Sequence, residues 1–319
     1  MIEREPLPER DAWLERRPRF VNGSEIATVC GEASYGSLAE LYAEKKGLRP
    51  PLIDSGVLKR GRWGESAVFQ ALTETFPEWQ ISRASVHVVD RERRLACTPD
   101  GFAIAPDRNG IGIIQAKVIS RSVFKQRWLD SSDDDYASVK DGPATPPAAY
   151  ALQTLFEMML NECAWGVLAV LINGEFDWTL RLFHVERDAL IEERMLERAA
   201  AFWRDHLDAN VMPPFEPQRD AALVRHLYPK DDGTEIDLTT DNRALALVDE
   251  WIEVGDARKR LKKTEDALKT ELQGKIGEHT FARLADGRRL SWKQQHRKAH
   301  AVAASDFRVL RIHDAKAGE

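Results

Sequence analysis

The stretch CTPDGFAIAPDRNGIGIIQAK, residues 97–117, decides how the fold of this chain is interpreted. Proline, glycine and asparagine divide it into two runs rich in apolar residues. Such runs bounded by turn residues are typical of β-strands, so we expect strands at about 94–105 and 111–119. A third strand is expected just before them, at about 81–89. The stretch therefore predicts part of a β-sheet.

Four residues of these two strands could form one chemical site. Asp100 follows a proline on the first strand, and Gln115 and Lys117 stand two apart on the second. Because side chains alternate along a strand, Gln115 and Lys117 should leave the same face, while Ala116 points away and offers its carbonyl oxygen. Oxygen groups beside a lysine suit a magnesium ion and an attacking water, as phosphodiester hydrolysis requires.

Each residue also has an ordinary structural interpretation. Pro-Asp-Gly is turn chemistry by itself, so Asp100 could simply be a turn residue. Lys117 could lie on an exposed edge strand, although a lysine buried in so apolar a strand would need a partner. The case rests on the residues occurring together and in this order.

Two predicted helices add polar residues on apolar faces. Glu65 lies in the first turn of a helix expected from Gly61, on the stripe of Phe69 and Leu72 that should face the core. It could serve as a partner of the helix dipole, or as a carboxylate that faces a cation. Gln153 falls within the apolar helix ALQTLFEMML, where a buried amide commonly satisfies a backbone group.

Composition limits the class of protein. The chain has 319 residues, and its 43% of apolar residues is enough for a folded core. Three widely spaced cysteines form no CxxC pair and indicate reduced thiols in a cytoplasm. No segment resembles a signal peptide or a membrane span. The net charge of −6 divides into +8 over residues 258–319 and −14 elsewhere, so a basic piece that could grip phosphates follows an acidic body.

The order of elements predicts an α/β fold with a C-terminal extension. In GSEIATVCGEASYGSLAELYAEKKG, residues 23–47, two helices are expected around a turn, with Ser37 and Glu40 forming a capping box. After residue 240, four apolar residues recur every seven positions in a long charged helix: Leu247, Val254, Leu261 and Leu268. A hairpin turning at Asp286-Gly287 follows.

These residues in this order resemble the YqaJ-type viral recombinases, related to the lambda-type phage exonucleases of the PD-(D/E)XK nuclease superfamily. The resemblance covers most of the chain and includes GRWGE ending in Glu65, TPDG, QAK, and YALQ ending in Gln153. It implies a restriction-endonuclease-like core, a mixed central sheet flanked by helices, at residues 1–217. A basic extension at residues 218–319 would carry the long helix, the hairpin and a tail.

The resemblance also implies roles for individual residues. Asp100, Gln115, the Ala116 carbonyl and Glu65 would bind Mg²⁺ or Mn²⁺, and Lys117 would activate or orient water. Gln153 would contact DNA or brace the site. Arg17 and Ser24 match positions that recognise a terminal 5′-phosphate.

The departure from the family pattern is Gln115, which stands where an acidic residue is usual. An amide oxygen can ligate magnesium but brings no charge. The expected activity is exonucleolytic digestion of linear double-stranded DNA from 5′ ends, leaving 3′ single strands for a phage annealing protein. The protein would be a homo-oligomer in the bacterial host cytoplasm. The sequence is also compatible with two alternatives, a non-catalytic DNA-binding scaffold on a degenerate nuclease fold and an endonuclease of the same superfamily.

Overall fold

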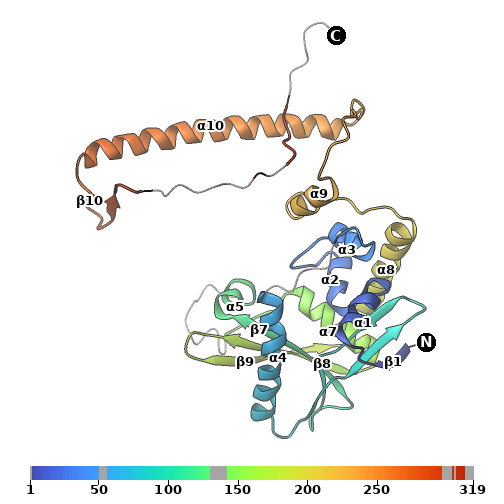
Figure 1. The fold of residues 1–319 in the computed structure, drawn as a ribbon. Helices are drawn as coiled ribbons and strands as arrows, with labels where there is room; N and C mark the ends of the chain where they lie inside the picture. Colours follow the sequence, from blue (N-terminus) through green and yellow to red (C-terminus); the bar gives the residue numbers. More distant parts are fainter. Residues whose placement is uncertain (1, 50–55, 130–141, 297–303, 305–306, 313–319) are drawn as a thin grey trace. The chain divides into compact units, whose positions relative to one another are not determined.

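The computed structural model describes residues 2–49, 56–129, 142–296, 304 and 307–312 (Figure 1). The chain divides into two compact units, residues 1–227 and 228–319. No helix in the described ranges is both long enough and apolar enough to cross a membrane.

A mixed five-stranded sheet forms the centre of the first unit. Its order is β3-β6-β7-β8-β9, in which only the β7–β8 pair is parallel. The strands are β3 (Gln80–Arg83), β6 (Gly101–Ile104), β7 (Gly112–Ser120), β8 (Trp165–Asn173) and β9 (Trp178–Glu186). The two parallel strands are buried almost throughout, which is why their sequences read as continuous apolar runs. The fold class expected from the sequence is confirmed.

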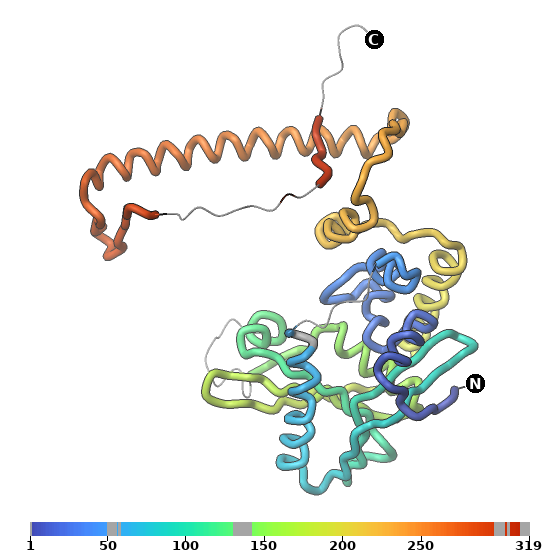
Figure 2. Tube along the Cα trace, viewed as in Figure 1, coloured from blue at the N-terminus to red at the C-terminus, as the bar shows by residue number. Residues whose placement is uncertain are grey.

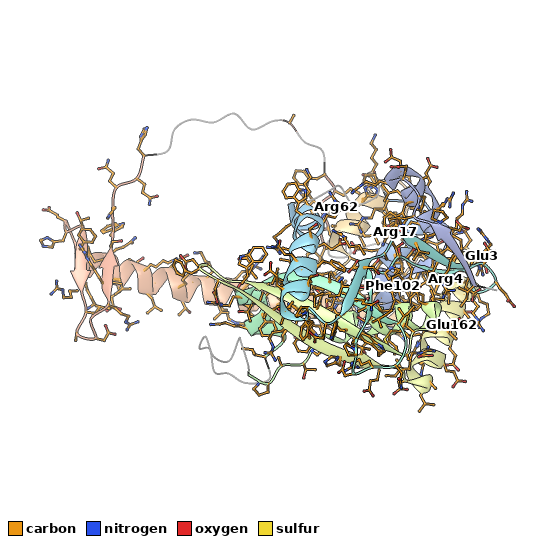
Figure 3. All side chains as sticks on the ribbon, turned by 90° about the horizontal axis from the view of Figure 1, so that it is seen from below. Glu3, Arg4, Arg17, Arg62, Phe102 and Glu162 are labelled. Atoms are coloured by element: carbon orange, nitrogen blue, oxygen red, sulfur yellow. The ribbon has the colours of Figure 1, made fainter. Side chains whose placement is uncertain are left out.

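Helices cover both faces of this sheet. Helix α4 (Gly56–Thr75) packs through Val68 and Leu72 against the face that carries Ile114 and Ala116. Helix α7 (Ala148–Asn161) covers the opposite face, where Met158 packs on Ile113. Figure 3 labels Arg62 on α4 and Phe102 on β6 and shows the helix against the strands. Alternate residues of β7 therefore face different helices, so the side chains of Gln115 and Lys117 lie on the α7 side.

A second, four-stranded sheet has the order β1-β4-β5-β2. Its strands are β1 (Ile2–Pro6), β2 (Val21–Asn22), β4 (Val86–Asp90) and β5 (Leu95–Cys97). Two expectations from the sequence are wrong here. The strands expected at 81–89 and 94–105 are each split, because the chain passes from one sheet to the other at Ala84–Ser85 and at residues 98–100.

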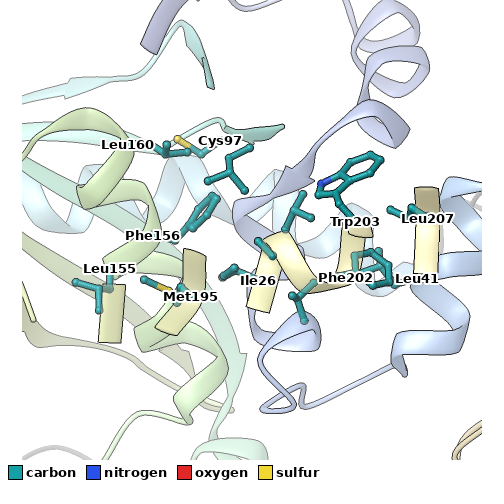
Figure 4. Close-up of a cluster of buried hydrophobic side chains, with 14 of the residues drawn as sticks. Ile26, Leu41, Cys97, Leu155, Phe156, Leu160, Met195, Phe202, Trp203 and Leu207 are labelled. Carbon is teal, nitrogen blue, oxygen red and sulfur yellow. The ribbon is translucent and has the colours of Figure 1, made fainter. Parts of the chain in front are cut away.

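Short helices pack beside the second sheet. The cluster in Figure 4 joins Ile26, Phe156, Met195 and Phe202, which come from three different helices. The helices of this part are α1 (Arg10–Arg16), η1 (Arg17–Arg19), η2 (Gly23–Glu25), α2 (Ile26–Val29), α3 (Leu38–Lys45), α8 (Ala189–Phe202), its π-helical continuation η3 (Trp203–Asp208) and α9 (Ala221–Leu227). Helix α5 (Arg121–Arg127) packs instead on the five-stranded sheet through Phe124. Half of the capping box expected at α3 is confirmed, since Ser37 Oγ accepts from Glu40 N–H at 3.0 Å, while the Glu40 carboxylate pairs with Arg49.

The second unit holds one long helix and a small hairpin (Figure 2). Helix α10 (Asn242–Ile276) begins at the capping residue Asp241, whose side chain accepts from two backbone N–H groups. The hairpin pairs β10 (Phe281–Arg283) with β11 (Arg289–Ser291), and Gly287 in its turn has a φ of +87°, which favours glycine. Both elements confirm the expectation for this part of the chain.

Candidate active site

Asp100 lies where the chain leaves the second sheet and enters β6. Its Oδ2 accepts from the backbone N–H of Ala116 at 2.8 Å and from Gln115 Nε2 at 2.5 Å. The β6–β7 ladder ends at the pair Gly101–Ile114, immediately before these residues. The backbone of Ala116 is thereby released from β6 and turns to Asp100 instead. Three of the residues selected from the sequence thus form one hydrogen-bonded cluster.

The Ala116 carbonyl faces the same edge of β7. Within a strand, the N–H and C=O groups of one residue point to the same side, as the paired bonds of antiparallel ladders show. The N–H of Ala116 points to Asp100, so its carbonyl oxygen does too. Asp100 remains partly exposed, so a cation approaching from solvent could meet both oxygens.

Lys117 completes the β7 part of the site. Its ammonium lies 5.5 Å from the centre of the Tyr150 ring, and that ring stacks on Trp128. A cation over an aromatic face is stabilised without being neutralised. Lys117 is therefore held in place while its charge stays available.

Glu65 reaches the site from the other face of the sheet. Gly64 brings α4 close to β7, since a Cβ atom there would lie 2.7 Å from Val118 Cγ2. Glu65 is half-buried and accepts a hydrogen bond from Arg83. Its pKa is raised, first by burial and then by the charge of Asp100, against the opposing effects of Arg83 and Lys117. The expected position in a first helical turn is wrong. The helix starts at Gly56, so Glu65 lies mid-helix and does not serve as a partner of the helix N-terminus.

A carboxylate that the sequence reasoning missed lies on α7. Glu157 is 1% exposed, and Gln153 Nε2 donates to its Oε1 at 3.0 Å. Burial, and then the charge of Asp100, raise the pKa of Glu157 well above its ordinary value. Gln153 thus braces Glu157 from one helical turn away. The signal was available in ALQTLFEMML, where a glutamate stands among apolar residues four positions after the glutamine.

The donor set fits a hard divalent cation. Burial is also the largest influence on Asp100, raising its pKa, while Lys117 and the Ala116 N–H act to lower it. Two buried oxygens, Gln115 Oε1 and Glu157 Oε2, have no hydrogen-bond partner among the described residues. Buried acceptors without partners are costly and call for a cation or a water. Within the same described part, no three His, Cys, Asp or Glu side chains converge as a ready-made ligand set, so amide and carbonyl oxygens would have to contribute.

Arg17 and Ser24 lie together beside this site. Arg17 Nη2 donates to Ser24 Oγ at 3.0 Å, and Arg17 also pairs with the buried Glu25. A small cleft of about 170 Å³ is lined by Ser24, Tyr150 and Gln153 among other residues. Because the Lys117 ammonium lies over the ring of Tyr150, this cleft connects the surroundings of Ser24 to the β7 site.

A larger cleft lies elsewhere in the first unit. It measures about 860 Å³, and Arg4, Phe102 and Glu162 are among the residues that line it. These three residues lie near one another in Figure 3. Its walls are mostly apolar and none of the clustered site residues lines it, so size alone does not mark the chemistry here.

Together, the mixed sheet and its flanking helices bring the acid, the amide and the lysine to the end of the β6–β7 pair. Residues 12–164 match the family model of the YqaJ-like viral recombinase domain. The resemblance inferred from the sequence is thus confirmed for this stretch of the chain.

The chain is also similar to individual known proteins. The chain is 24% identical to the protein YqaJ of Bacillus subtilis (strain 168) over 278 residues, which are 83% of this chain and 78% of that protein. Among solved structures, it is similar to an alkaline exonuclease from Laribacter hongkongensis, with a TM-score of 0.45 and 18% identity over 67% of this chain and 99% of that one. A phage-related exonuclease from Haemophilus somnus 129PT gives a TM-score of 0.41 and 12% identity, over 60% of this chain and 96% of that one.

Proposed function

We propose that the chain is a metal-dependent deoxyribonuclease that digests linear double-stranded DNA from its ends. The observation that carries the proposal is the cluster of Asp100, Gln115 and the Ala116 backbone beside Lys117. The YqaJ-like domain supports the same class of activity.

The residues of the site would divide the work as follows. Asp100, Gln115 Oε1, the Ala116 carbonyl and Glu65 would hold Mg²⁺ or Mn²⁺, whose charge stabilises the phosphate and acidifies bound water. Lys117, held over Tyr150, would orient the attacking water and offset the charge that develops on the phosphate. Gln153 would keep the α7 side of the site in place through Glu157.

Digestion from 5′ ends, leaving 3′ single strands, is part of the proposal. Arg17 and Ser24 would receive the terminal phosphate, because a guanidinium and a hydroxyl already lie side by side there. Duplexes with 5′-hydroxyl ends should then be digested about tenfold or more slowly than those with 5′-phosphates. Equal rates on the two ends would remove this role from Arg17 and Ser24.

Partners follow from the same proposal. The 3′ strands would pass to a phage single-strand annealing protein in the bacterial host cytoplasm. The chain would also form a homo-oligomer, since the four heptad residues of α10 are 49–72% exposed: Leu247, Val254, Leu261 and Leu268. A monomer mass by light scattering at micromolar concentration would contradict the oligomer.

The decisive test is digestion of end-labelled linear duplex beside a covalently closed circle, with Mg²⁺. Wild type should degrade only the linear DNA, and Lys117→Ala should lose about 10²–10⁴-fold of the rate. Lys230→Ala, which removes an exposed lysine of the second unit, should match wild type. Cleavage of the circle would indicate an endonuclease instead.

A second candidate is a non-catalytic DNA-binding scaffold. Gln115 favours it, because an amide replaces the charge that would bind a cation most strongly. In that case wild type would bind duplex through its basic residues 258–298, with strong salt dependence, and would digest nothing.

A further inference from the structure

Glu157 lies outside every motif that led to the site, yet it occupies a place that only a special role explains. A glutamate in the interior is rare unless it is paired with a cation. Glu157 is 1% exposed, and its Oε1 accepts a hydrogen bond from the neutral amide of Gln153. Its second oxygen, Oε2, is buried and has no partner in the described ranges.

The backbone next to Glu157 leaves room for its carboxyl group. A Cβ atom on Gly23 would lie 3.0 Å from Glu157 Oε1. Gly23 directly precedes Ser24, so any side chain here would press on the glutamate beside the small cleft. The carboxylate thus has a prepared position between α7 and η2.

Gln115 also has a buried side-chain oxygen without a partner among the described residues. Its Nε2 is used by Asp100, while its Oε1 is buried without a partner in the part of the chain that the structure describes. The side chain of Gln115 lies on the face of β7 that α7 covers. Gln115 is neutral where an acidic residue is usual, whereas the Glu157 carboxylate has an oxygen without a partner in the described ranges. The two residues lie on β7 and α7, which enclose the same face of the sheet.

Asp100 and Lys117 connect the two residues. Gln115 donates to Asp100, and Glu157 is close enough to both Asp100 and Lys117 for their charges to act on it. We propose that Glu157 supplies the carboxylate that Gln115 lacks, binding the divalent cation directly or through one of its waters. This inference rests on the proposed metal-dependent function.

Exchanging the two residues tests the inference. Mn²⁺ binding to the full-length chain is measured by isothermal titration calorimetry, so the readout does not depend on activity. Glu157→Gln keeps the size of the side chain and should weaken binding about tenfold or more. The double variant Gln115→Glu with Glu157→Gln should return the affinity to within about threefold of wild type. Glu74→Gln, an exposed glutamate on α4, is the matched control and should bind as wild type does.

The outcomes separate the two proposals. If Asp100→Asn abolishes binding but Glu157→Gln binds as wild type, the role of Glu157 is overturned and the metal site stands. If wild type binds no Mn²⁺, or Asp100→Asn binds normally, the proposed metal site fails and the role of Glu157 fails with it. Should Glu157→Gln fold poorly by circular dichroism, the exchanged variant decides, because a folded exchange variant without binding also overturns the inference.

Discussion

The pKa values of two buried glutamates, Glu25 and Glu157, are shifted in opposite directions. Burial acts to raise the pKa of Glu25, but Lys45 and Arg17 outweigh it and the pKa is lowered. Lys45 Nζ lies 2.7 Å from Glu25 Oε2. The strongest charge acting on Glu157 is that of Asp100, another carboxylate, and its pKa is raised. A buried acid with its own cations holds the fold together, whereas one without them is suited to binding a cation from solution.

The largest expected effect is on the rate of DNA digestion at the site that contains Asp100 and Glu157. Asp100→Asn should reduce digestion of linear duplex by about 10³-fold, because it removes the central charge that would bind the cation. Unfolding by urea should change little, since the amide can still accept from Ala116 N–H. A fully active Asp100→Asn variant would contradict the proposed difference between a structural Glu25 and a cation-binding site at Asp100 and Glu157.

Glu25→Gln should have the opposite profile. Removing one member of a buried ion-pair network leaves Lys45 without its partner and should destabilise the first unit by about 3–5 kcal/mol. Urea denaturation followed by circular dichroism measures the change. Asp232→Asn, which alters an exposed aspartate, is the control and should stay within about 0.5 kcal/mol of wild type.

Cation binding should stabilise the folded protein only when Asp100 is present. With Mn²⁺ at 100 times its dissociation constant, the free energy of unfolding should rise by about 2.7 kcal/mol in wild type and not in Asp100→Asn. Thermal unfolding with and without Mn²⁺ measures this rise. Equal stabilisation of both proteins would place the cation elsewhere.

The smallest effect is on the metal-free protein as pH varies. Because folding raises the pKa of Glu157, its ionisation costs stability as pH rises above the ordinary value of 4.5. Glu157→Gln should therefore raise the melting temperature at pH 8 by about 2–4 °C, equivalent to ~1 kcal/mol, and not at pH 4. Glu25 has the reverse sign: its stabilisation is complete above 4.5 and is lost as pH falls through its lowered pKa. A lower melting temperature for Glu157→Gln than for wild type at pH 8 would contradict the opposite pH dependences expected for Glu157 and Glu25.

The sequence by itself determined the local features. The alternation of β7 placed Gln115 and Lys117 on one face, Ser37 marked the start of α3, and Asp286-Gly287 marked the hairpin turn. These depend on neighbours in the chain, so residue type and spacing are enough to predict them. The order of short motifs also indicated the resemblance to the family whose model matches residues 12–164.

Only the tertiary structure decided which polar groups meet. The break between β5 and β6 that frees Asp100 to reach Ala116 depends on two sheets competing for one stretch of chain. The approach of α4 at Gly64 and the burial of Glu157 depend on packing between elements far apart in the sequence. A charge acts through space, so whether a glutamate faces Lys45 or Asp100 could not be known until the chain had folded.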